Sequence, residues 1–168
     1  ISKTLITSTS EVYGTAQRVP ITEDHRLSAQ SPYAASKIGA DQLALSYNKS
    51  FDLPVTIIRP FNTFGPRQST RAIIPSIITQ ISSNKKLIKL GKLNPTRDFT
   101  YVEDTANAFI AAIKRKNISG KTINIGNSFE ISIRNILKIL KNDFGYKFEV
   151  VIDKKRVRTK NSEVDRLF

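Results

Sequence analysis

The chain has 168 residues, of which 39% are hydrophobic and 24% are charged, and it contains no cysteine and a single histidine, His25. This length and composition are typical of one globular domain with a buried core. The lack of cysteine excludes disulfides and thiolate metal ligands, and one histidine makes no metal site. No apolar run is long enough to span a membrane, so we expect a cytoplasmic protein without a metal and without a membrane partner.

The net charge of +13 is the strongest signal in the composition. Such a charge suits nucleic acid, an acidic membrane surface or a phosphorylated small molecule. The basic residues are scattered through residues 85–92, 114–116 and 154–158 and do not form a basic helix interleaved with aromatic residues. We therefore interpret most of them as solvated surface charge and expect no nucleic acid partner.

Two short apolar segments with a long helix between them open the chain. Residues 4–8 and 55–58 are predicted strands, because they are rich in β-branched residues and are bounded by polar or proline residues. Residues 9–14 form a polar turn, residues 15–30 a loop, and residues 32–51 a helix. This order predicts a βαβ unit in a parallel sheet, with ligands beyond the carboxyl ends of its strands.

The rest of the chain alternates in the same way. We expect a loop over 61–69, helices over 73–83, 102–116 and 132–142, and strands over 87–90, 97–101, 122–125 and 148–152. The fold class is therefore α/β.

The start of the first helix carries the residues of chemical interest. Ser31 and Pro32 suit an N-cap and a first turn, and Tyr33 and Lys37 then lie four residues apart on one helix face. An ammonium close to a phenol favours the phenolate, which can act as a general base. The alternative is an amphipathic helix with a surface tyrosine and lysine, and this short pattern alone does not exclude it.

Five stretches in a fixed order give the chain a family resemblance. They are residues 8–14 (STSEVYG), 31–37 (SPYAASK), 59–67 (RPFNTFGPR), 97–104 (RDFTYVED) and 124–126 (NIG). With them the chain resembles the extended short-chain dehydrogenase/reductase (NAD-dependent epimerase/dehydratase) family. It looks most like the nucleotide-sugar 4,6-dehydratases of the UDP-N-acetylglucosamine (legionaminic-type) group.

The resemblance implies the C-terminal part of a Rossmann-like parallel-sheet domain plus a smaller α/β substrate-binding region. Residues 1–65 would form the second half of the Rossmann-like domain, and 66–168 mainly the substrate-binding region, with 102–126 returning to the Rossmann sheet. The glycine-rich turn with which such enzymes bind the dinucleotide is missing from this sequence. We expect a fragment that is inactive alone; a natural short protein that has lost the cofactor is the alternative.

Catalytic roles follow from the same resemblance. Thr9 would hydrogen-bond the sugar 4-hydroxyl, Tyr33 would remove its proton, and Lys37 would hold the cofactor ribose and support the phenolate. Glu11 would take the C5 proton and help to expel the C6 hydroxyl, and Ser10 stands where some glucose dehydratases carry an aspartic acid. Glu11 is the residue that separates a dehydratase from a 4-epimerase.

The resemblance implies NAD as the cofactor, although the residue that would separate NAD from NADP lies in the missing half. The expected cofactor contacts are Ser8, Tyr33, Lys37 and Pro60. The expected contacts with a nucleotide-sugar substrate, a UDP-sugar being favoured, are Asn62, Arg97, Arg158, Glu163 and Arg71. Among the arginines we expect Arg97 to bind the diphosphate, whereas Arg71 suits surface charge better.

The family also implies a homodimer, formed in part by the Tyr33 helix. An apolar stripe over residues 40–51 is compatible with that contact and equally with packing in the core. Three other functions stay open: a nucleotide-sugar 4-epimerase, a UDP-glucuronate decarboxylase and, outside enzymes, a basic nucleic-acid-binding module.

Overall fold

The computed structural model describes residues 1–157 and 159–168, apart from the Lys160 side chain, and has the α/β fold that the sequence predicts. The strands are β1 (Thr4–Thr7), β2 (Val55–Pro60), β3 (Asn62–Phe64), β4 (Leu87–Leu90), β5 (Thr96–Tyr101), β6 (Thr122–Ile125), β7 (Glu130–Ser132), β8 (Glu149–Ile152) and β9 (Arg166–Leu167). The helices are α1 (Pro32–Phe51), α2 (Ile73–Ser82), α3 (Val102–Lys114) and α4 (Ile133–Asn142), with short 3-10 helices η1 (Ser10–Tyr13), η2 (Lys154–Arg156) and η3 (Lys160–Ser162).

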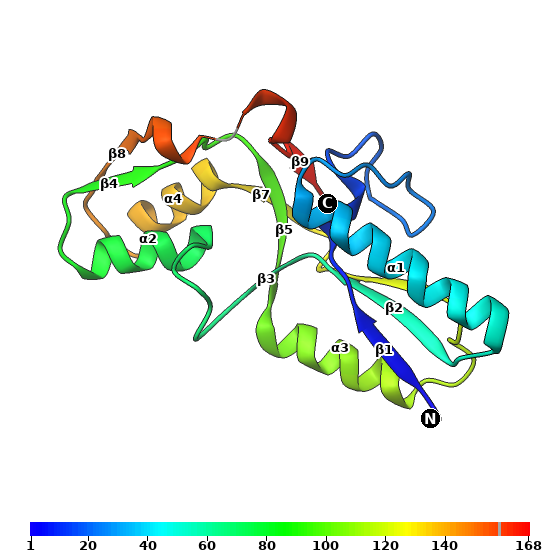
Figure 1. The fold of residues 1–168 in the computed structure, drawn as a ribbon. Helices are drawn as coiled ribbons and strands as arrows, with labels where there is room; N and C mark the ends of the chain where they lie inside the picture. Colours follow the sequence, from blue (N-terminus) through cyan, green and yellow to red (C-terminus); the bar gives the residue numbers. More distant parts are fainter. Residues whose placement is uncertain (158) are drawn as a thin grey trace.

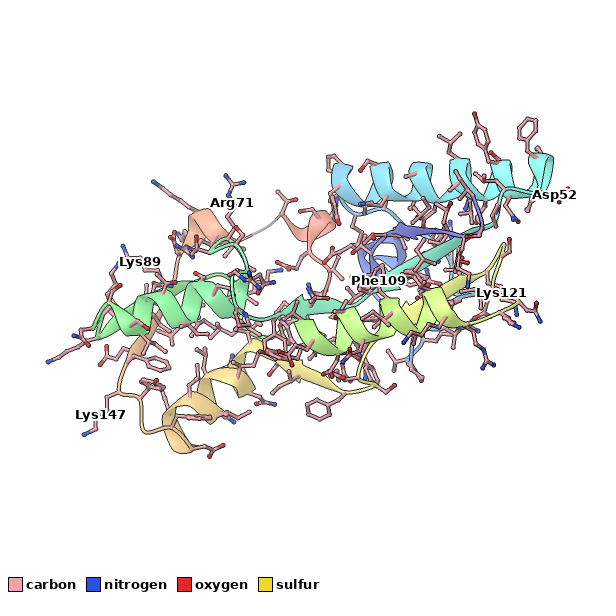
Figure 2. All side chains as sticks on the ribbon, turned by 90° about the horizontal axis from the view of Figure 1, so that it is seen from below. Asp52, Arg71, Lys89, Phe109, Lys121 and Lys147 are labelled. Atoms are coloured by element: carbon pink, nitrogen blue, oxygen red, sulfur yellow. The ribbon has the colours of Figure 1, made fainter. Side chains whose placement is uncertain are left out.

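A parallel sheet in the order β1-β2-β6 forms one end of the molecule. Ile6 lies opposite Ile57 across β1 and β2, and Ile58 lies opposite Ile123 across β2 and β6. Helices α1 and α3 lie on opposite faces of this sheet (Figures 1 and 2). Apolar residues of α3, with Ala112 among them, pack on Ile58 and its neighbours, so burial of these side chains holds the layers together.

Helix α1 begins where the sequence predicts. The Ser31 hydroxyl accepts a hydrogen bond from the Ala34 backbone N–H at 3.1 Å, and Pro32 is in the first turn. Its apolar stripe is not core, however: Leu43 is 61% exposed and Phe51 is 72% exposed. The inward face of the helix is occupied instead by a charged residue that has a partner in β2, which is described below.

The other end of the molecule is a smaller α/β lobe. Strands β4 and β8 pair in parallel, and α2 and α4 pack with them around a second apolar core that includes Ile77, Ile88 and Leu137. Strand β5 pairs with β3, β7 and β9 and runs between the two ends (Figure 1). The sequence did not predict β3, β7 and β9, because strands of two or three residues show no periodic pattern.

Candidate functional site

The polar turn after β1 presents Glu11 at the carboxyl end of the sheet. The Thr9 hydroxyl oxygen caps the turn by accepting a hydrogen bond from the Glu11 backbone N–H at 3.2 Å. Ser10 points inward and is 2% exposed, whereas Glu11 is half-buried. The Thr9 hydroxyl keeps its own proton available for donation, because it only accepts in this capping bond.

The turn closes at Gly14, which has φ of +65°. A Cβ atom there would lie 2.5 Å from the Ser28 carbonyl oxygen, so the close approach of the two backbone segments requires glycine. This contact fixes the end of the segment that carries Glu11.

Tyr33 and Lys37 project from α1 near the same sheet edge. The Tyr33 side chain is 54% exposed. The Lys37 ammonium donates a hydrogen bond to the Thr7 carbonyl oxygen at 3.0 Å, which ties the helix to the last residue of β1. Two of its three donors remain for other groups.

Ser8 follows the last residue of β1, and Pro60 ends β2. The Ser8 side chain is buried, and its hydroxyl donates to Asp41 Oδ2 at 2.9 Å, so it faces the interior. Pro60 is the last residue of β2 and lies opposite Ile125 of β6.

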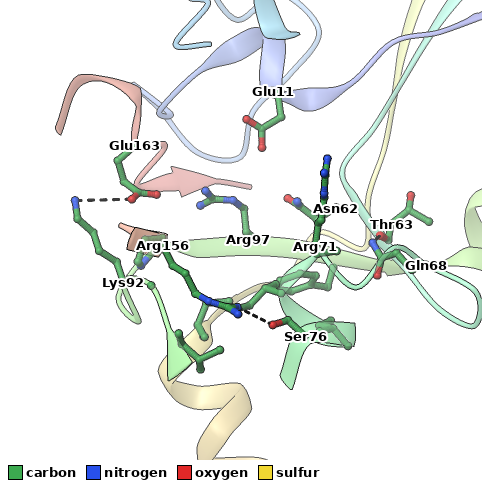
Figure 3. Close-up of a pocket in the computed structure, with 18 residues that line it drawn as sticks. Glu11, Asn62, Thr63, Gln68, Arg71, Ser76, Lys92, Arg97, Arg156 and Glu163 are labelled. Carbon is green, nitrogen blue, oxygen red and sulfur yellow. Dashed lines mark hydrogen bonds and ion pairs between the residues drawn. The ribbon is translucent and has the colours of Figure 1, made fainter. Parts of the chain in front are cut away.

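A cavity of about 460 Å³ lies between the two ends of the molecule. Its walls come from η1, β3, the start of α2, the end of β4, β5 and η2 (Figure 3). Four of the five residues that we expected to contact a nucleotide sugar line it: Asn62, Arg71, Arg97 and Glu163. The fifth, Arg158, lies outside the described residues.

The cavity is rich in positive charge. Its basic lining residues are Arg71, Lys92, Arg97 and Arg156, and its acidic ones are Glu11 and Glu163. The Arg156 guanidinium donates to the Ser76 hydroxyl at 3.0 Å, and Lys92 Nζ lies 3.9 Å from Glu163 Oε2 (Figure 3). Such a lining suits an anion whose other parts carry hydroxyl groups.

The sequence reading missed Lys92 and Arg156, which it assigned to solvated surface charge. Both sit in basic segments with no motif, and only the pairing of β4 with β8 brings their ends to the cavity. The signal that could have found them is their position just after the ends of two predicted strands.

Two residues that line the cavity also carry side-chain hydrogen-bond acceptors that no described residue uses. The side-chain oxygens Asn62 Oδ1 and Gln68 Oε1 are buried and have no hydrogen-bond partner among the described residues. A buried acceptor without a partner is costly, so these two atoms are suited to receive donors from a ligand.

A second cavity of about 560 Å³ lies beside the first, and its lining includes Tyr33, Ser31 and Glu11. Glu11 therefore lies between the Tyr33 phenol on one side and the arginine-lined cavity on the other. In Figure 3 the Glu11 carboxylate points toward Arg97, Asn62 and Arg71.

The donor set at the sheet edge fits a dinucleotide cofactor. A half-exposed phenol and an ammonium with spare donors lie at the carboxyl ends of parallel strands, where such cofactors bind in doubly wound sheets. Lys37 and Tyr33 would face its ribose and nicotinamide. Ser8 would contribute through its backbone, since its hydroxyl is engaged by Asp41.

The part of the chain that the structure describes has neither a cluster of metal-binding side chains nor a membrane-spanning helix. There, no group of three or more histidine, cysteine, aspartate or glutamate residues is arranged to hold a metal ion. Within the same residues, no helix has the length and apolar character needed to cross a membrane.

A parallel sheet flanked by helices, with a tyrosine and a lysine near its carboxyl edge, defines a Rossmann-like fold. The cationic cavity beside the sheet is suited to an anionic ligand. The family model described as GDP-mannose 4,6 dehydratase matches residues 2–168. The chain belongs to this family of NAD-dependent nucleotide-sugar epimerases and dehydratases.

Named relatives agree with this assignment. The dTDP-D-glucose 4,6-dehydratase of Dictyostelium discoideum is 38% identical over 154 residues, which cover 84% of this chain and 35% of the relative. The chain spans half or less of the length of the curated relatives it matches.

Solved structures share the fold. The dTDP-glucose 4,6-dehydratase of Bacillus anthracis in complex with NAD aligns with a TM-score of 0.83 and 31% identity, covering 98% of this chain and 51% of that one. The UDP-glucuronic acid 4-epimerase of Bacillus cereus, in complex with UDP-glucuronic acid and NAD, aligns with a TM-score of 0.87 and 30% identity over the same shares. The expected cofactor, NAD, is thus the one held by both of these similar proteins.

Proposed function

We propose that the whole protein is an NAD-dependent nucleotide-sugar 4,6-dehydratase. The observation that carries the proposal is the position of Glu11, which lines both the Tyr33 cavity and the arginine-lined cavity. A carboxylate between a phenol base and a sugar site can act on a second carbon of the same sugar. A 4-epimerase needs no such group.

The first half of the reaction uses Thr9 and Tyr33. The Thr9 hydroxyl, which is free to donate, orients the sugar 4-hydroxyl, and the Tyr33 phenolate removes its proton. Tyr33 and Lys37 would hold NAD, which would supply a hydride acceptor for C4 and a hydride donor for C6. Lys37, anchored by the Thr7 carbonyl, lies one helical turn after Tyr33, and its ammonium would support the phenolate.

The second half uses Glu11. Oxidation at C4 acidifies the C5 hydrogen, and the Glu11 carboxylate takes that proton. The C5 electron pair forms a double bond to C6 as the C6 hydroxyl leaves, and Glu11 returns the proton to this leaving group. One water is lost, and the roles of base and acid fall on one side chain because Ser10 is buried and faces away. When hydride returns to C6, C5 would take a proton that comes from solvent, which is why deuterium is expected there in deuterated water.

The cationic cavity supplies the substrate contacts. Arg97, Arg71 and Arg156 would bind the diphosphate by charge-assisted hydrogen bonds. Asn62 and Glu163 would accept hydrogen bonds from hydroxyl groups of the sugar and the nucleotide ribose. Our preference for a UDP-sugar rests on the motif resemblance alone.

Two further points belong to the proposal. The 168-residue chain would be inactive without a glycine-rich nucleotide-binding half. The whole protein would be a homodimer, since α1 exposes Leu43, Tyr47 and Phe51 in a single apolar stripe that a second copy could cover. Size-exclusion chromatography with light scattering tests the second point.

The activity is tested on the protein translated from the complete reading frame. It is incubated with UDP-N-acetylglucosamine and NAD in deuterated water, and the product is analysed by mass spectrometry and NMR. Loss of one water with deuterium at C5 supports the proposal. Unchanged mass with an inverted C4 indicates the epimerase, and no reaction with any UDP- or GDP-sugar refutes both.

A further inference from the structure

A chain of buried polar side chains lies directly beneath the two catalytic elements. Asp41 Oδ2 accepts hydrogen bonds from the Ser8 hydroxyl at 2.9 Å and from Arg59 Nε and Nη2 at 3.0 Å each. Arg59 Nη1 donates to the Tyr13 hydroxyl at 3.0 Å, and that hydroxyl donates to Asn124 Oδ1 at 2.8 Å. We call these five residues the buried network.

The centre of the network is buried. Tyr13 and Asp41 are 0% exposed, and Arg59 is 2% exposed. The Arg59 guanidinium also lies over the Tyr13 ring, 5.0 Å from its centroid. Burial raises the pKa of the Tyr13 hydroxyl, although Arg59 opposes that shift, so Tyr13 stays a neutral donor to Asn124.

Two members of the network, Asp41 and Tyr13, belong to the elements that carry the catalytic groups. Asp41 follows Lys37 by one turn of α1 and Tyr33 by two turns, so all three lie on one helix face. Tyr13 is the last residue of η1, two residues after Glu11. Arg59 joins the two by hydrogen bonds. Ile38 of α1 also packs against the apolar cluster that contains Val12 and Tyr13, and the directional bonds through Arg59 add a fixed spacing to this packing.

We infer that the buried network positions Glu11 relative to Tyr33, so that one sugar ring meets the C4 base and the C5 base without moving. This inference rests on the proposed function. Tyr13, Arg59 and Asp41 are positioning residues, because none of them lines either cavity at which the sugar would react. Breaking the link at Tyr13 displaces the Glu11 turn and leaves Tyr33 and Lys37 on their helix.

The test compares Tyr13→Phe with Thr56→Val. Tyr13→Phe removes one buried hydroxyl from the network. Thr56→Val removes one buried hydroxyl from the same strand as Arg59, because Thr56 Oγ1 donates to the Ile118 carbonyl at 2.8 Å outside the network. Each variant therefore removes one buried hydroxyl, and only Tyr13→Phe disconnects the network.

The first measurement is hydrogen–deuterium exchange of the whole protein. We expect peptides covering residues 9–14 to exchange about tenfold faster or more in Tyr13→Phe, because the variant loses both hydrogen bonds of the Tyr13 hydroxyl, and to be unchanged in Thr56→Val. Equal exchange in the two variants overturns the inference, whether or not the whole protein is a dehydratase.

The second measurement uses the whole protein under single-turnover conditions. Quenching with borodeuteride labels sugar that has been oxidised at C4, and mass spectrometry separates sugar that has kept its C6 hydroxyl from sugar that has lost water. We expect Tyr13→Phe to oxidise C4 at nearly the wild-type rate but to lose water about 10- to 100-fold more slowly, because displacement of Glu11 affects only the second step. An equal slowing of both steps overturns the inference; a wild type without any product refutes the proposed function instead.

Discussion

The ion pair between Asp41 and Arg59 gives the sharpest stability prediction. Their side chains are 0% and 3% exposed, so the Asp41→Asn variant leaves a guanidinium buried without a counter-charge. Removing one member of such a pair costs about 3–5 kcal/mol in the free energy of unfolding. For a domain of this size, 1 kcal/mol shifts the melting midpoint by about 2–4 °C, so we expect a decrease of about 6–20 °C.

The assay is thermal unfolding of the 168-residue chain followed by circular dichroism. The double variant Asp41→Asn/Arg59→Met should recover part of the loss, because it removes the unpaired charge and leaves an apolar side chain of similar length. The control is Asp24→Asn, which breaks the exposed ion pair with Arg18 and should leave the midpoint unchanged within error. A double variant that melts no higher than Asp41→Asn refutes the argument from the unpaired charge.

Three more predictions concern other parts of the molecule. Arg156→Gln should weaken binding of UDP-N-acetylglucosamine about tenfold by calorimetry, since it removes one charged donor from the cavity. The Arg166 guanidinium holds the pKa of the Glu130 carboxyl below its usual range. The ion pair therefore stabilises the folded state at pH values above the pKa of Glu130 in the unfolded chain, and this stabilisation is lost as the pH falls through the pKa of Glu130 in the folded chain. Glu130→Gln should reduce the dependence of the unfolding free energy on pH in the acid range. Gly14→Ala should lower the free energy of unfolding in urea by about 2–4 kcal/mol, and Gly145→Ala by about 1 kcal/mol. Both glycines have a positive φ, but only a Cβ atom at position 14 would clash with a backbone carbonyl oxygen.

Each of these has a contradicting result. Wild-type affinity in Arg156→Gln would mean that its side chain does not reach the ligand. An unchanged pH dependence in the acid range for Glu130→Gln would mean that other carboxylates control acid unfolding. Equal losses in the two glycine variants would mean that the Ser28 carbonyl moves aside at no cost.

The sequence predicted the parts of the fold that have local signals. The start of α1 follows from its Ser31 cap and Pro32, and the buried strands β2 and β6 from their β-branched residues. Strands β3, β7 and β9 form only because neighbouring strands offer hydrogen bonds, and such tertiary pairing leaves no periodic trace.

The candidate site was predictable where a motif marked it. Asn62 and Arg97 belong to motifs, and both line the cavity. Lys92 and Arg156 resemble any other surface cation in this basic chain, and only the packing of the smaller lobe shows where they point. The sequence did not predict the buried network either, because Asp41 and Arg59 are 18 residues apart and come together only in the folded chain.

The most direct test of the account is C5 proton exchange in Glu11→Gln. The experiment incubates three whole proteins with UDP-N-acetylglucosamine and NAD in deuterated water: wild type, Glu11→Gln and Glu103→Gln. Glu103→Gln is the control because it removes an exposed carboxylate in the first turn of α3. We predict that Glu11→Gln still oxidises C4, as borodeuteride trapping detects, but loses C5 exchange and water elimination by about 100-fold or more, while the control keeps both. C5 deuteration and water loss at the wild-type rate in Glu11→Gln would contradict the central claim that Glu11 is the second base.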